Sequence, residues 1–400
     1  MEIFDQVINR NGRNFVKNNE DFLRNVFKND PDVENVVKDV IPLWVADMDF
    51  KSPPAVIDAI KNYADYGIFG YPRSGPKARR AAIEWYKRRH NWEIEDDSLL
   101  AAPTVMFSVA MAIRALSREG ESVIIFQPVY PPFAGVVLAN GRNLVVSELV
   151  QKEGRYEIDF EDFEKKVVEN HVKVLLFCSP HNPVGRVWTI NELKRLASIV
   201  ERYGVKVISD EIHCDFVFDG HEHIPFAKVS EYVKQNSITC IAPTKTFNLA
   251  GIQGSFCVAA NRSLKAAVLE PWEATGLHTP SGTAFAAMEA AYRYGSEWFD
   301  SLQEYIYDNV KLVGETLKET KIKVIPSEST YLLWLDCRKM DVPPNTLLLK
   351  YFLKEAHVWL NEGLTFGEGG KGFVRMNVAS PRSVLKEALR RITLLDAVKR

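Results

Sequence analysis

Three polar side chains of different chemistry each follow a short apolar run of the sequence. They are the amide Asn182, the carboxylate Asp210 and the amine Lys245, after the runs 172–178, 205–208 and 237–241. A lysine amine in a buried place can form a Schiff base with a carbonyl compound. A carboxylate can keep a pyridine nitrogen protonated, and an amide can donate a hydrogen bond to a ring oxygen. The three types together therefore suit a pyridine aldehyde as the ligand.

The elements around these residues explain why they should meet. Predominantly apolar runs of this kind are typical of central strands in a parallel sheet covered on both faces, and the helical pattern at 191–203 predicts the connection of a βαβ unit. In open α/β sheets, ligands bind outside the carboxyl ends of the strands, so we expect the three side chains to converge there. Other strands are predicted at 122–126, 144–148, 237–242 and 255–259, and helices at 54–66, 76–90 and 105–116.

The two ends of the chain have patterns that differ from this middle part. Residues 1–40 are polar and charged, with a short helix expected near 20–28, and residues 285–320 indicate one long helix or two broken ones. An α+β unit follows, with strands at 323–325, 331–336 and 373–377 and helices at 347–356 and 383–397. We predict an N-terminal arm with part of a small domain over 1–47, a large ligand-binding domain over 48–285 and a C-terminal small α+β domain over 286–400.

Composition and charge exclude several classes of protein. The 400 residues are 46% hydrophobic and 26% charged, which is typical of a globular protein. With 50 basic and 52 acidic residues the net charge is -2, so we expect no nucleic-acid partner and no anionic membrane surface. The five cysteines form no CxxC pair, and no basic stretch leads into an apolar core at the N-terminus. We therefore expect a cytoplasmic protein without a membrane span.

Longer motifs around the three polar residues resemble the fold-type I pyridoxal-phosphate enzymes. The motifs are Asn182-Pro183-Val184-Gly185, Asp210-Glu211-Ile212-His213 and the segment 243–251, PTKTFNLAG. Within that group the chain is similar to the MalY/PatB branch, the cystathionine β-lyase-like C–S lyases related to class I/II aminotransferases. That similarity rests on the segments WVADMDF (44–50), FGY (69–71), PVYPPF (128–133) and FVRMN (373–377). It implies an α/β fold, in which a large domain with a mostly parallel seven-stranded sheet between helices is joined to a smaller α+β domain.

The resemblance also implies a role for individual side chains. Lys245 would hold pyridoxal 5′-phosphate as a Schiff base and act as the general acid and base, and Asp210 would pair with the ring nitrogen. Asn182 would donate to the ring oxygen and contact the substrate. Arg375 would bind the substrate α-carboxylate through a bidentate fork, with Ala46 as a further substrate contact.

The remaining cofactor contacts are implied in the same way. His213 would lie near the ring oxygen, where related aminotransferases often place a tyrosine, and Tyr130 would stack on the ring. Tyr71 would reach the phosphate of a neighbouring subunit, which implies a homodimer. The phosphate is expected at a helix N-terminus, where backbone amides and the helix dipole favour an anion. The expected contacts there are the amides of Val105 and Met106, with Thr244 as a further cofactor contact.

The sequence departs from the family at two positions beside the expected phosphate site. Thr104 stands where a glycine is common, and Ala242 stands where a serine is common three residues before the lysine. Neither change removes the backbone amides that would bind the phosphate. A metal is not expected, because the pair His221 and His223 lacks a third ligand at the spacing of a metal site.

The activity that the resemblance implies is carbon–sulfur β-elimination. Such an enzyme acts on cystathionine- or cysteine-type amino acids and releases pyruvate, ammonia and a thiol. Two other functions stay open. An aminotransferase would share every step up to the carbanion and then reprotonate the cofactor, and no residue of the chain decides between the two outcomes. A regulatory protein that keeps the fold is the third function, although Lys245, Asp210 and Arg375 together argue for activity.

Overall fold

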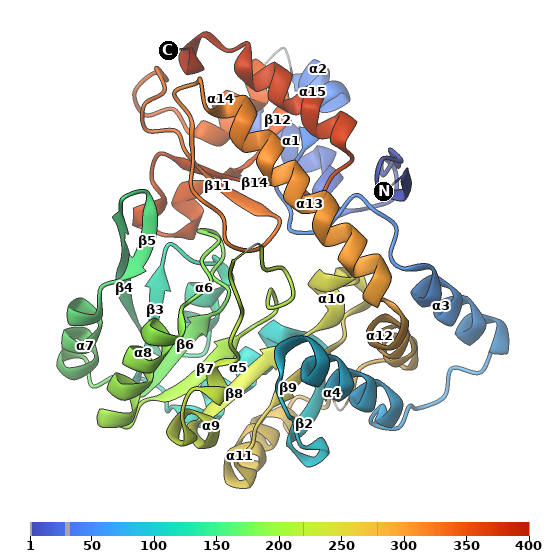
Figure 1. Cartoon of the computed structure of the whole chain (residues 1–400), viewed down its shortest axis with the longest axis vertical. Helices are drawn as coiled ribbons and strands as arrows, with labels where there is room; N and C mark the ends of the chain where they lie inside the picture. Colours follow the sequence, from blue (N-terminus) through green and yellow to red (C-terminus); the bar gives the residue numbers. More distant parts are fainter. Residues whose placement is uncertain (1, 29–32, 219, 278, 400) are drawn as a thin grey trace. The chain divides into compact units, whose positions relative to one another are not determined.

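The computed structural model describes residues 2–28, 33–218, 220–277 and 279–399. The chain divides into two compact units, and Figure 1 shows the elements of each. The smaller unit comprises Met1–Phe50, Pro183–Gly185 and Ser301–Arg400, and the larger unit comprises Lys51–Asn182 and Arg186–Asp300. We keep the domain boundaries after residues 47 and 285 as a prediction, because compactness alone does not establish where an independently folding domain ends.

The larger unit is built on one mixed sheet of eight strands among the described residues. The strand order is β2-β9-β8-β7-β6-β3-β4-β5, and the five strands from β8 to β4 run parallel to one another. The strands are β2 (Leu99–Ala102), β3 (Ser122–Gln127), β4 (Asn143–Lys152), β5 (Arg155–Ile158), β6 (Val174–Cys178), β7 (Lys206–Asp210), β8 (Ser237–Ile241) and β9 (Ser255–Val258). The predicted α/β class is confirmed. The predicted count of seven strands is one too low, because β5 turns back and pairs antiparallel with the end of β4.

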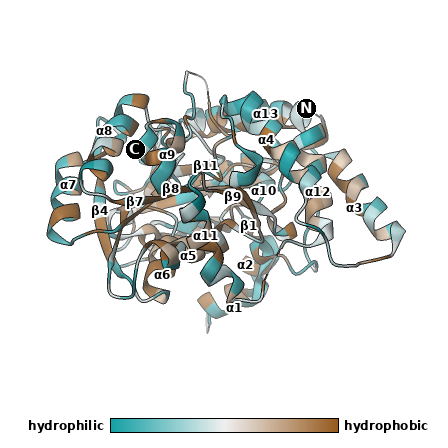
Figure 2. Ribbon diagram, turned by 90° about the horizontal axis from the view of Figure 1, so that it is seen from below, coloured by the Kyte–Doolittle hydropathy of each residue, from teal (hydrophilic) through white to brown (hydrophobic). Residues whose placement is uncertain are grey.

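Helices cover both faces of this sheet. Strands β6 and β8 are buried along their whole length, and the central strands are mostly hydrophobic in Figure 2. Side chains of α5, α6 and α11 pack on one face, and Phe163 of α7 meets Phe126 on the other. The helices are α3 (Pro54–Tyr66), α4 (Pro76–His90), α5 (Val105–Leu116), α6 (Pro132–Ala139), α7 (Phe160–Glu169), α8 (Ile190–Arg202), α9 (Glu231–Asn236), α10 (Pro243–Thr246), α11 (Arg262–Glu273) and α12 (Gly282–Tyr294).

Local sequence signals explain where several of these helices begin. Helix α8 starts with a capping box, in which Thr189 and Glu192 exchange hydrogen bonds between side chain and backbone. Helices α3 and α4 start at Pro54 and Pro76, because proline lacks the N–H that a first-turn residue leaves unused. The region 285–320 forms two helices, because Gly295 ends α12 before α13 begins.

The smaller unit contains an antiparallel sheet of order β10-β11-β14-β13 and a parallel pair of β1 with β12. Its strands are β1 (Ile41–Pro42), β10 (Lys323–Val324), β11 (Leu332–Asp336), β12 (Val358–Trp359), β13 (Asn361–Glu362) and β14 (Phe373–Asn377). Its helices are α1 (Glu20–Val26), α2 (Val33–Asp39), α14 (Leu348–Ala356) and α15 (Arg382–Thr393), together with most of α13 (Ser296–Leu317). The predicted α+β pattern of this part of the chain is therefore present.

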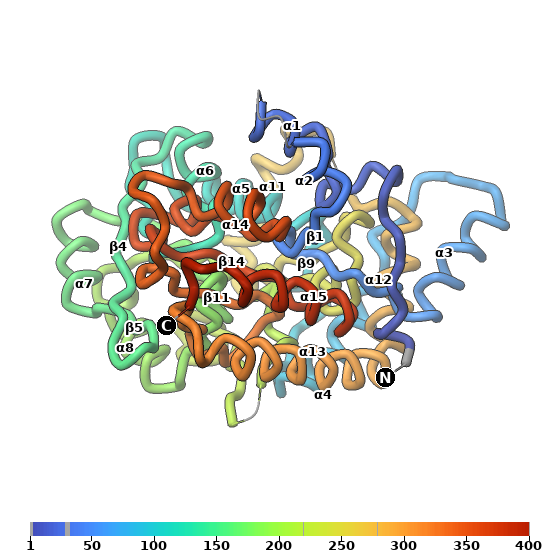
Figure 3. Tube along the Cα trace, turned by 90° about the horizontal axis from the view of Figure 1, so that it is seen from above, coloured from blue at the N-terminus to red at the C-terminus, as the bar shows by residue number. Residues whose placement is uncertain are grey.

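The N-terminal segment belongs to the same unit as the C-terminal strands. Figure 3 shows it in blue beside β14 and α15 in red. Ile41 N donates to His357 O at 2.8 Å, and Asn377 N donates to Leu43 O at 2.8 Å, so residues 41–43 bridge β12 and β14. The indole rings of Trp44 and Trp359 stack with their centroids 4.5 Å apart.

Short 3₁₀ helices complete the description of the chain. They are Glu2–Phe4, Val16–Asn18, Asp96–Ser98, Phe226–Lys228, Ala250–Ile252, Gly363–Phe366, Glu368–Gly370 and Asp396–Val398. Within the described residues, no helix has both the length and the apolar character needed to cross a membrane.

Candidate active site

Strands β6, β7 and β8 are parallel neighbours, so their carboxyl ends lie at one edge of the sheet. Asp210, the last residue of β7, is in register with Cys178 on one side and Cys240 on the other. Asn182 lies in the loop that follows β6, and Lys245 lies in helix α10, which follows β8. The fold therefore brings the loops that carry the amide, the carboxylate and the amine to the same edge, and the roles of these residues stay a prediction.

Asp210 is a buried carboxyl group with 5% of its surface exposed. Burial raises the pKa of Asp210 to about 7, while a hydrogen bond from Ile212 N and the charge of Lys245 act to lower it. The Ile212 N–H donates to Asp210 Oδ1 at 3.1 Å. A carboxyl group that is desolvated in this way gains most from a cation beside it. A protonated pyridine nitrogen would be such a cation, so the environment of Asp210 fits the pyridoxal ring.

Lys245 lies in the third position of the short helix α10. Two backbone hydrogen bonds hold this turn, from Phe247 N to Pro243 O at 2.9 Å and from Leu249 N to Thr244 O at 2.8 Å. The ring of Phe247 is buried against Trp85, with the ring centroids 5.3 Å apart. The backbone that carries the amine is therefore fixed before any ligand binds. Ala242, the N-cap, makes no side-chain capping bond.

A network of buried carboxylates and imidazoles lies behind the two loops that carry Lys245 and Asp210. Asp215 Oδ1 accepts hydrogen bonds from His90 Nε2 at 2.7 Å and from Trp85 Nε1 at 3.0 Å. Asp215 Oδ2 accepts one from the Thr246 hydroxyl at 2.6 Å. Burial works to raise the pKa of Asp215, but the bonds and charge of these partners, His90 above all, hold that pKa below its usual range.

The network continues on the side of Asp210. The rings of His90 and His223 meet edge to face with their centroids 5.6 Å apart, and His223 Nε2 lies 2.9 Å from Glu211 Oε2. Glu211 Oε1 also accepts bonds from the Ser209 hydroxyl at 2.8 Å and from Phe226 N at 2.9 Å. Sequence reasoning missed these residues as a group. One signal in the sequence could have indicated them: acidic residues follow the buried strand β7. A buried carboxylate without a partner costs free energy, so these residues require partners.

Three residues in or beside this network have side chains of the types that bind metal ions. His90, Cys214 and Asp215 bring ligand atoms within 4.8 Å of one another. Both oxygens of Asp215 already accept hydrogen bonds from protein donors, and burial raises the pKa of the Cys214 thiol well above its usual value. Because both Asp215 oxygens are engaged by protein donors, we assign no metal to this cluster.

Tyr130, Asn182 and His213 lie on the same edge. Tyr130 N donates to Asn182 O at 3.2 Å, which joins the loops after the neighbouring strands β3 and β6. The Tyr130 ring meets Phe133 edge to face with the centroids 6.1 Å apart. His213 is buried in the turn after Asp210, where its carbonyl accepts from Phe216 N at 3.1 Å.

Helix α5 presents its N-terminus to this edge. Strand β2 is antiparallel to β9, and β9 is antiparallel to β8, so β2 and β8 run in the same direction. Ala102, the last residue of β2, therefore lies at the same edge of the sheet as the end of β8, which Lys245 follows. Thr104 is the N-cap of α5, and its hydroxyl accepts from Phe107 N at 3.1 Å. The threonine that replaces a glycine of the family is therefore explained as a helix cap. Val105 and Met106 follow as the first two helical residues, where backbone amides suit an anion.

The predicted substrate contacts Arg375 and Ala46 lie in the smaller unit. Arg375 is a buried residue of β14; its Nη2 donates to Trp44 O at 2.8 Å, and its guanidinium lies 4.9 Å from the centre of the Phe366 ring. The Tyr331 hydroxyl donates to Ala46 O at 3.1 Å. The fold thus brings Arg375 and the segment that contains Ala46 together.

Tyr71 stands apart from the other predicted residues. It lies in the larger unit between α3 and α4, and its side chain is fully exposed. Tyr66, Ile68 and Phe69 beside it are each more than 60% exposed. The predicted contact of Tyr71 with the cofactor of a second subunit stays a prediction.

Comparisons with known proteins identify the family of this chain. The chain matches the family described as aminotransferase class I and II over residues 38–392. It is 38% identical to the cystathionine β-lyase PatB of Bacillus subtilis over 89% of this chain and 92% of that protein, and 34% identical to the protein MalY of Escherichia coli over 90% and 92%.

Solved structures give the same result. Cystalysin from Treponema denticola, which contains pyridoxal 5′-phosphate, superimposes with a TM-score of 0.90 at 35% identity over 97% of both chains. The PLP-bound C–S lyase from Staphylococcus hominis does so with a TM-score of 0.87 at 31% identity over 97% of both chains. The chain therefore belongs to the class I and II aminotransferase family of fold-type I enzymes, in its MalY/PatB-like branch.

Proposed function

We propose that this protein is a pyridoxal 5′-phosphate-dependent carbon–sulfur β-lyase. It acts on cystathionine- or cysteine-type amino acids and releases pyruvate, ammonia and a thiol. One observation carries the proposal: Lys245, at the end of β8, and the buried carboxyl of Asp210, at the end of β7, lie at one sheet edge in a chain whose relatives include cystathionine β-lyases.

The residues of the larger unit supply the cofactor site. Lys245 would hold the cofactor through its amine, and Asp210 would pair with its ring nitrogen. The Asn182 amide and the His213 imidazole would bind the ring oxygen, and Tyr130 would pack against the ring. The phosphate binds at the N-terminus of α5, to the amides of Val105 and Met106, with Thr244 as a further contact. When bound, the cofactor supplies an electron sink for the substrate's Cα.

Different side chains of the protein carry out the separate steps of the elimination. Arg375 and Ala46 bind the substrate α-carboxylate, while Asp210 keeps a proton on the ring nitrogen by its negative charge. Once the substrate's amine has displaced it from the cofactor, the Lys245 amine would be free to take the proton from Cα, and the bond from Cβ to sulfur would break with its electron pair on sulfur. The thiolate leaves and a double bond forms between Cα and Cβ. Hydrolysis of the remaining product yields pyruvate and ammonia.

The exposed segment 66–71 supports a homodimer in a cytoplasmic enzyme. Tyr66, Ile68, Phe69 and Tyr71 form a run of large apolar side chains that are each more than 60% exposed. Such a patch is typical of a protein interface. We place a second copy on it, so that Tyr71 reaches the phosphate of the partner. Light scattering of the wild type and of Phe69→Asp tests this arrangement, since the charge should yield a monomer if the segment is the interface.

The assay for the reaction is direct. Purified enzyme loaded with cofactor is mixed with cystathionine, and pyruvate and free thiol are measured. Release of both supports the lyase, and release of neither contradicts it. Product formation that requires an added keto acid would identify an aminotransferase instead. Lys245→Ala should abolish turnover, whereas Lys194→Ala, which removes an exposed lysine of α8, should not change it.

A further inference from the structure

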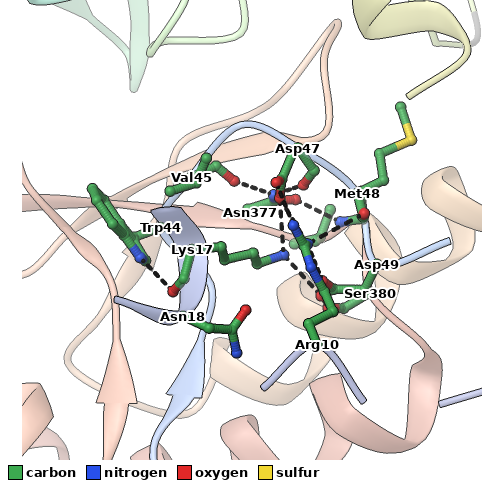
Figure 4. Close-up of polar contacts among 12 residues, drawn as sticks. Arg10, Lys17, Asn18, Trp44, Val45, Asp47, Met48, Asp49, Asn377 and Ser380 are labelled. Atoms are coloured by element: carbon green, nitrogen blue, oxygen red, sulfur yellow. Dashed lines mark hydrogen bonds and ion pairs between the residues drawn. The ribbon is translucent and has the colours of Figure 1, made fainter. Parts of the chain in front are cut away.

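Four charged side chains of the smaller unit form a compact cluster, which we name the arm clamp: Arg10, Lys17, Asp47 and Asp49 (Figure 4). Arg10 binds both oxygens of Asp47, at 2.6 and 3.0 Å, and Asp49 Oδ1 at 2.8 Å. Lys17 Nζ lies 2.8 Å from Asp49 Oδ2 and 3.7 Å from Asp47 Oδ1. Two cations from the N-terminal arm therefore face two anions from the segment 44–50.

Lys17 of the arm clamp is buried and its three partners are largely shielded from solvent, although much of the arm around them is exposed. The side chain of Lys17 is 0% exposed and that of Arg10 is 12% exposed. Burial works to raise the pKa of Asp49, but Lys17, Ser380 and Arg10 hold it below its usual value. In contrast, the apolar side chains of Val7, Phe15 and Val16 remain 46–64% exposed. The arm therefore buries the charge of Lys17 together with one apolar ring, that of Phe4, which is 1% exposed.

Burial of charge is an inefficient way to gain stability. Desolvation offsets much of the attraction in a buried ion pair, and apolar residues of the same size often stabilise a fold more. What a buried ion pair does well is to specify one arrangement, because any other leaves a charge unpaired. The construction of the arm clamp therefore indicates a positioning role.

The segment that the clamp holds carries the proposed carboxylate site. Four consecutive carbonyls, from residues 44 to 47, each accept a hydrogen bond from a side chain of the antiparallel sheet. The bonds come from Arg375 Nη2 to Trp44 O at 2.8 Å, Asn377 Nδ2 to Val45 O and Asp47 O at 2.6 Å each, and the Tyr331 hydroxyl to Ala46 O at 3.1 Å. Figure 4 shows Asn377 beside this segment.

The arm also reaches the residue that orients Arg375. Trp44 Nε1 donates to Lys17 O at 3.1 Å, while Trp44 O accepts from Arg375. Asp49 N donates to Ala379 O at 3.0 Å, and the Ser380 hydroxyl donates to the Asp49 carboxylate. The side chains of Asp47 and Asp49 thus anchor a segment whose backbone sets the position of the guanidinium and of Ala46.

We propose that Arg10 and Lys17 are positioning residues for substrate binding, which hold the segment 44–49 so that Arg375 and Ala46 are aligned with the substrate's α-carboxylate. This inference rests on the proposed role of Arg375. The clamp acts on a group that is bound equally in the ground state and in the transition state. Its loss should therefore raise KM and leave kcat nearly unchanged.

The test uses the loaded holoenzyme and the variant Lys17→Met, which removes the charge and keeps the length of the side chain. We expect KM for cystathionine to rise by about tenfold, which corresponds to the loss of one charge-assisted hydrogen bond. The value of kcat should change by less than about threefold. The probe 3-(methylthio)propionate has a carboxylate and no amine. Its dissociation constant, measured by calorimetry, should rise in parallel with KM. The visible absorbance of the bound cofactor without substrate should stay as in the wild type.

Two further variants separate positioning from stability. Lys38→Met, at an exposed lysine of α2 in the same unit, is the matched control and should change none of these values. The pair Lys17→Met with Asp49→Asn removes one buried charge of each sign. Lys17→Met alone should lower the midpoint of thermal unfolding, and the double variant should recover it. However, KM and the dissociation constant of the probe should stay raised in the double variant.

Four results would overturn the proposal, and three of them concern the variants: equal binding of the probe by wild type and Lys17→Met, a fall in kcat at unchanged KM, or recovery of KM in the double variant. The calorimetric measurement needs no turnover. If the wild type released no pyruvate from cystathionine, the lyase assignment would fail while the effect of Lys17 on carboxylate binding would still be decided. A wild type that does not bind the probe at all also overturns the proposal.

Discussion

The Thr246 hydroxyl donates a hydrogen bond of 2.6 Å to Asp215 Oδ2. Thr246 is the neighbour of Lys245 in α10, and Asp215 lies in the loop that starts at Asp210, so this bond joins the two loops that carry the proposed amine and carboxylate. His90 Nε2 at 2.7 Å and Trp85 Nε1 at 3.0 Å bring helix α4 to the same carboxylate. One buried carboxylate therefore holds three segments of the larger unit together.

Substitution of Asp215 should weaken this junction. We expect Asp215→Asn to lower the free energy of unfolding by about 1–3 kcal/mol, because charge-assisted hydrogen bonds inside the protein are replaced by neutral ones. Urea denaturation at neutral pH, followed by circular dichroism, measures the change. Asp58→Asn, at an exposed position of α3, is the control and should change the value by less than about 0.5 kcal/mol.

The effect of Asp215 should also depend on pH in a definite direction. Its partners hold the pKa of Asp215 in the folded protein below the ordinary value of about 4. The stability that it contributes is thus fully present above about pH 4 and is lost as the pH falls through the lower, folded pKa. The difference between wild type and Asp215→Asn should shrink under strongly acidic conditions. A difference that stays constant on acidification would contradict this assignment.

Asp210 should show the opposite dependence in the enzyme without cofactor. Burial raises its pKa to about 7, above the value of about 4 in the unfolded chain. The folded protein then binds the proton more tightly, so this group favours folding below about pH 4 and the contribution is lost between about pH 4 and about pH 7. We expect wild-type apoenzyme to lose up to a few kcal/mol across this range relative to Asp210→Asn. Urea denaturation of both apoproteins at several pH values measures the difference.

Addition of pyridoxal 5′-phosphate supplies the control for Asp210. A ring cation beside the carboxylate favours its charged form, so the wild type should regain stability near neutral pH on loading. Asp210→Asn should gain less from the same cofactor. Parallel pH profiles of the two apoproteins would contradict a raised pKa of Asp210, and an equal gain on loading would show that Asp210 does not face the ring.

The strand ends at the candidate site were predictable from the sequence for a physical reason. The runs before Asn182, Asp210 and Lys245 are predominantly apolar, and the strands they form are almost wholly buried. Parallel strands must end at a common edge, so the convergence of the following loops needs no knowledge of the rest of the chain. Strand β5 was missed although its four residues alternate polar and apolar side chains as a half-buried strand does, because so short a run is a weak signal.

The charged networks were not predictable in this way. His90 and Asp215 are 125 residues apart in sequence, and their contact depends on how α4 packs on the loop after β7. Lysine is a surface residue by default, and nothing in the pattern around Lys17 distinguishes it from its exposed neighbours. Its burial becomes necessary only once Asp47 and Asp49 are placed on the segment that follows β1. Long-range electrostatic partners are therefore the part that the sequence alone does not disclose.

The capping threonine of α5 gives a prediction that separates helix stability from cofactor binding. Thr104→Ala should lower the free energy of unfolding by about 1 kcal/mol, because Phe107 N loses its acceptor, whereas Thr104→Gly should cost only a few tenths of a kcal/mol. Neither change should weaken cofactor binding, since the proposed donors are backbone amides. Fluorescence titration of the apoenzymes with pyridoxal 5′-phosphate measures this. Weaker binding by both variants would mean that the Thr104 hydroxyl itself contacts the phosphate.

Substitution of Arg375 by lysine tests the carboxylate site while keeping the positive charge. A lysine has no planar fork, so it cannot donate to Trp44 O and to both oxygens of a carboxylate in one fixed geometry. We expect Arg375→Lys to raise KM for cystathionine by about ten- to a hundredfold, with a smaller change in kcat. Arg338→Lys, at an exposed position of the same unit, is the control. A normal KM in Arg375→Lys would mean that charge alone attracts the substrate, and the orientation of the guanidinium by the segment 44–49 would then have no part in binding.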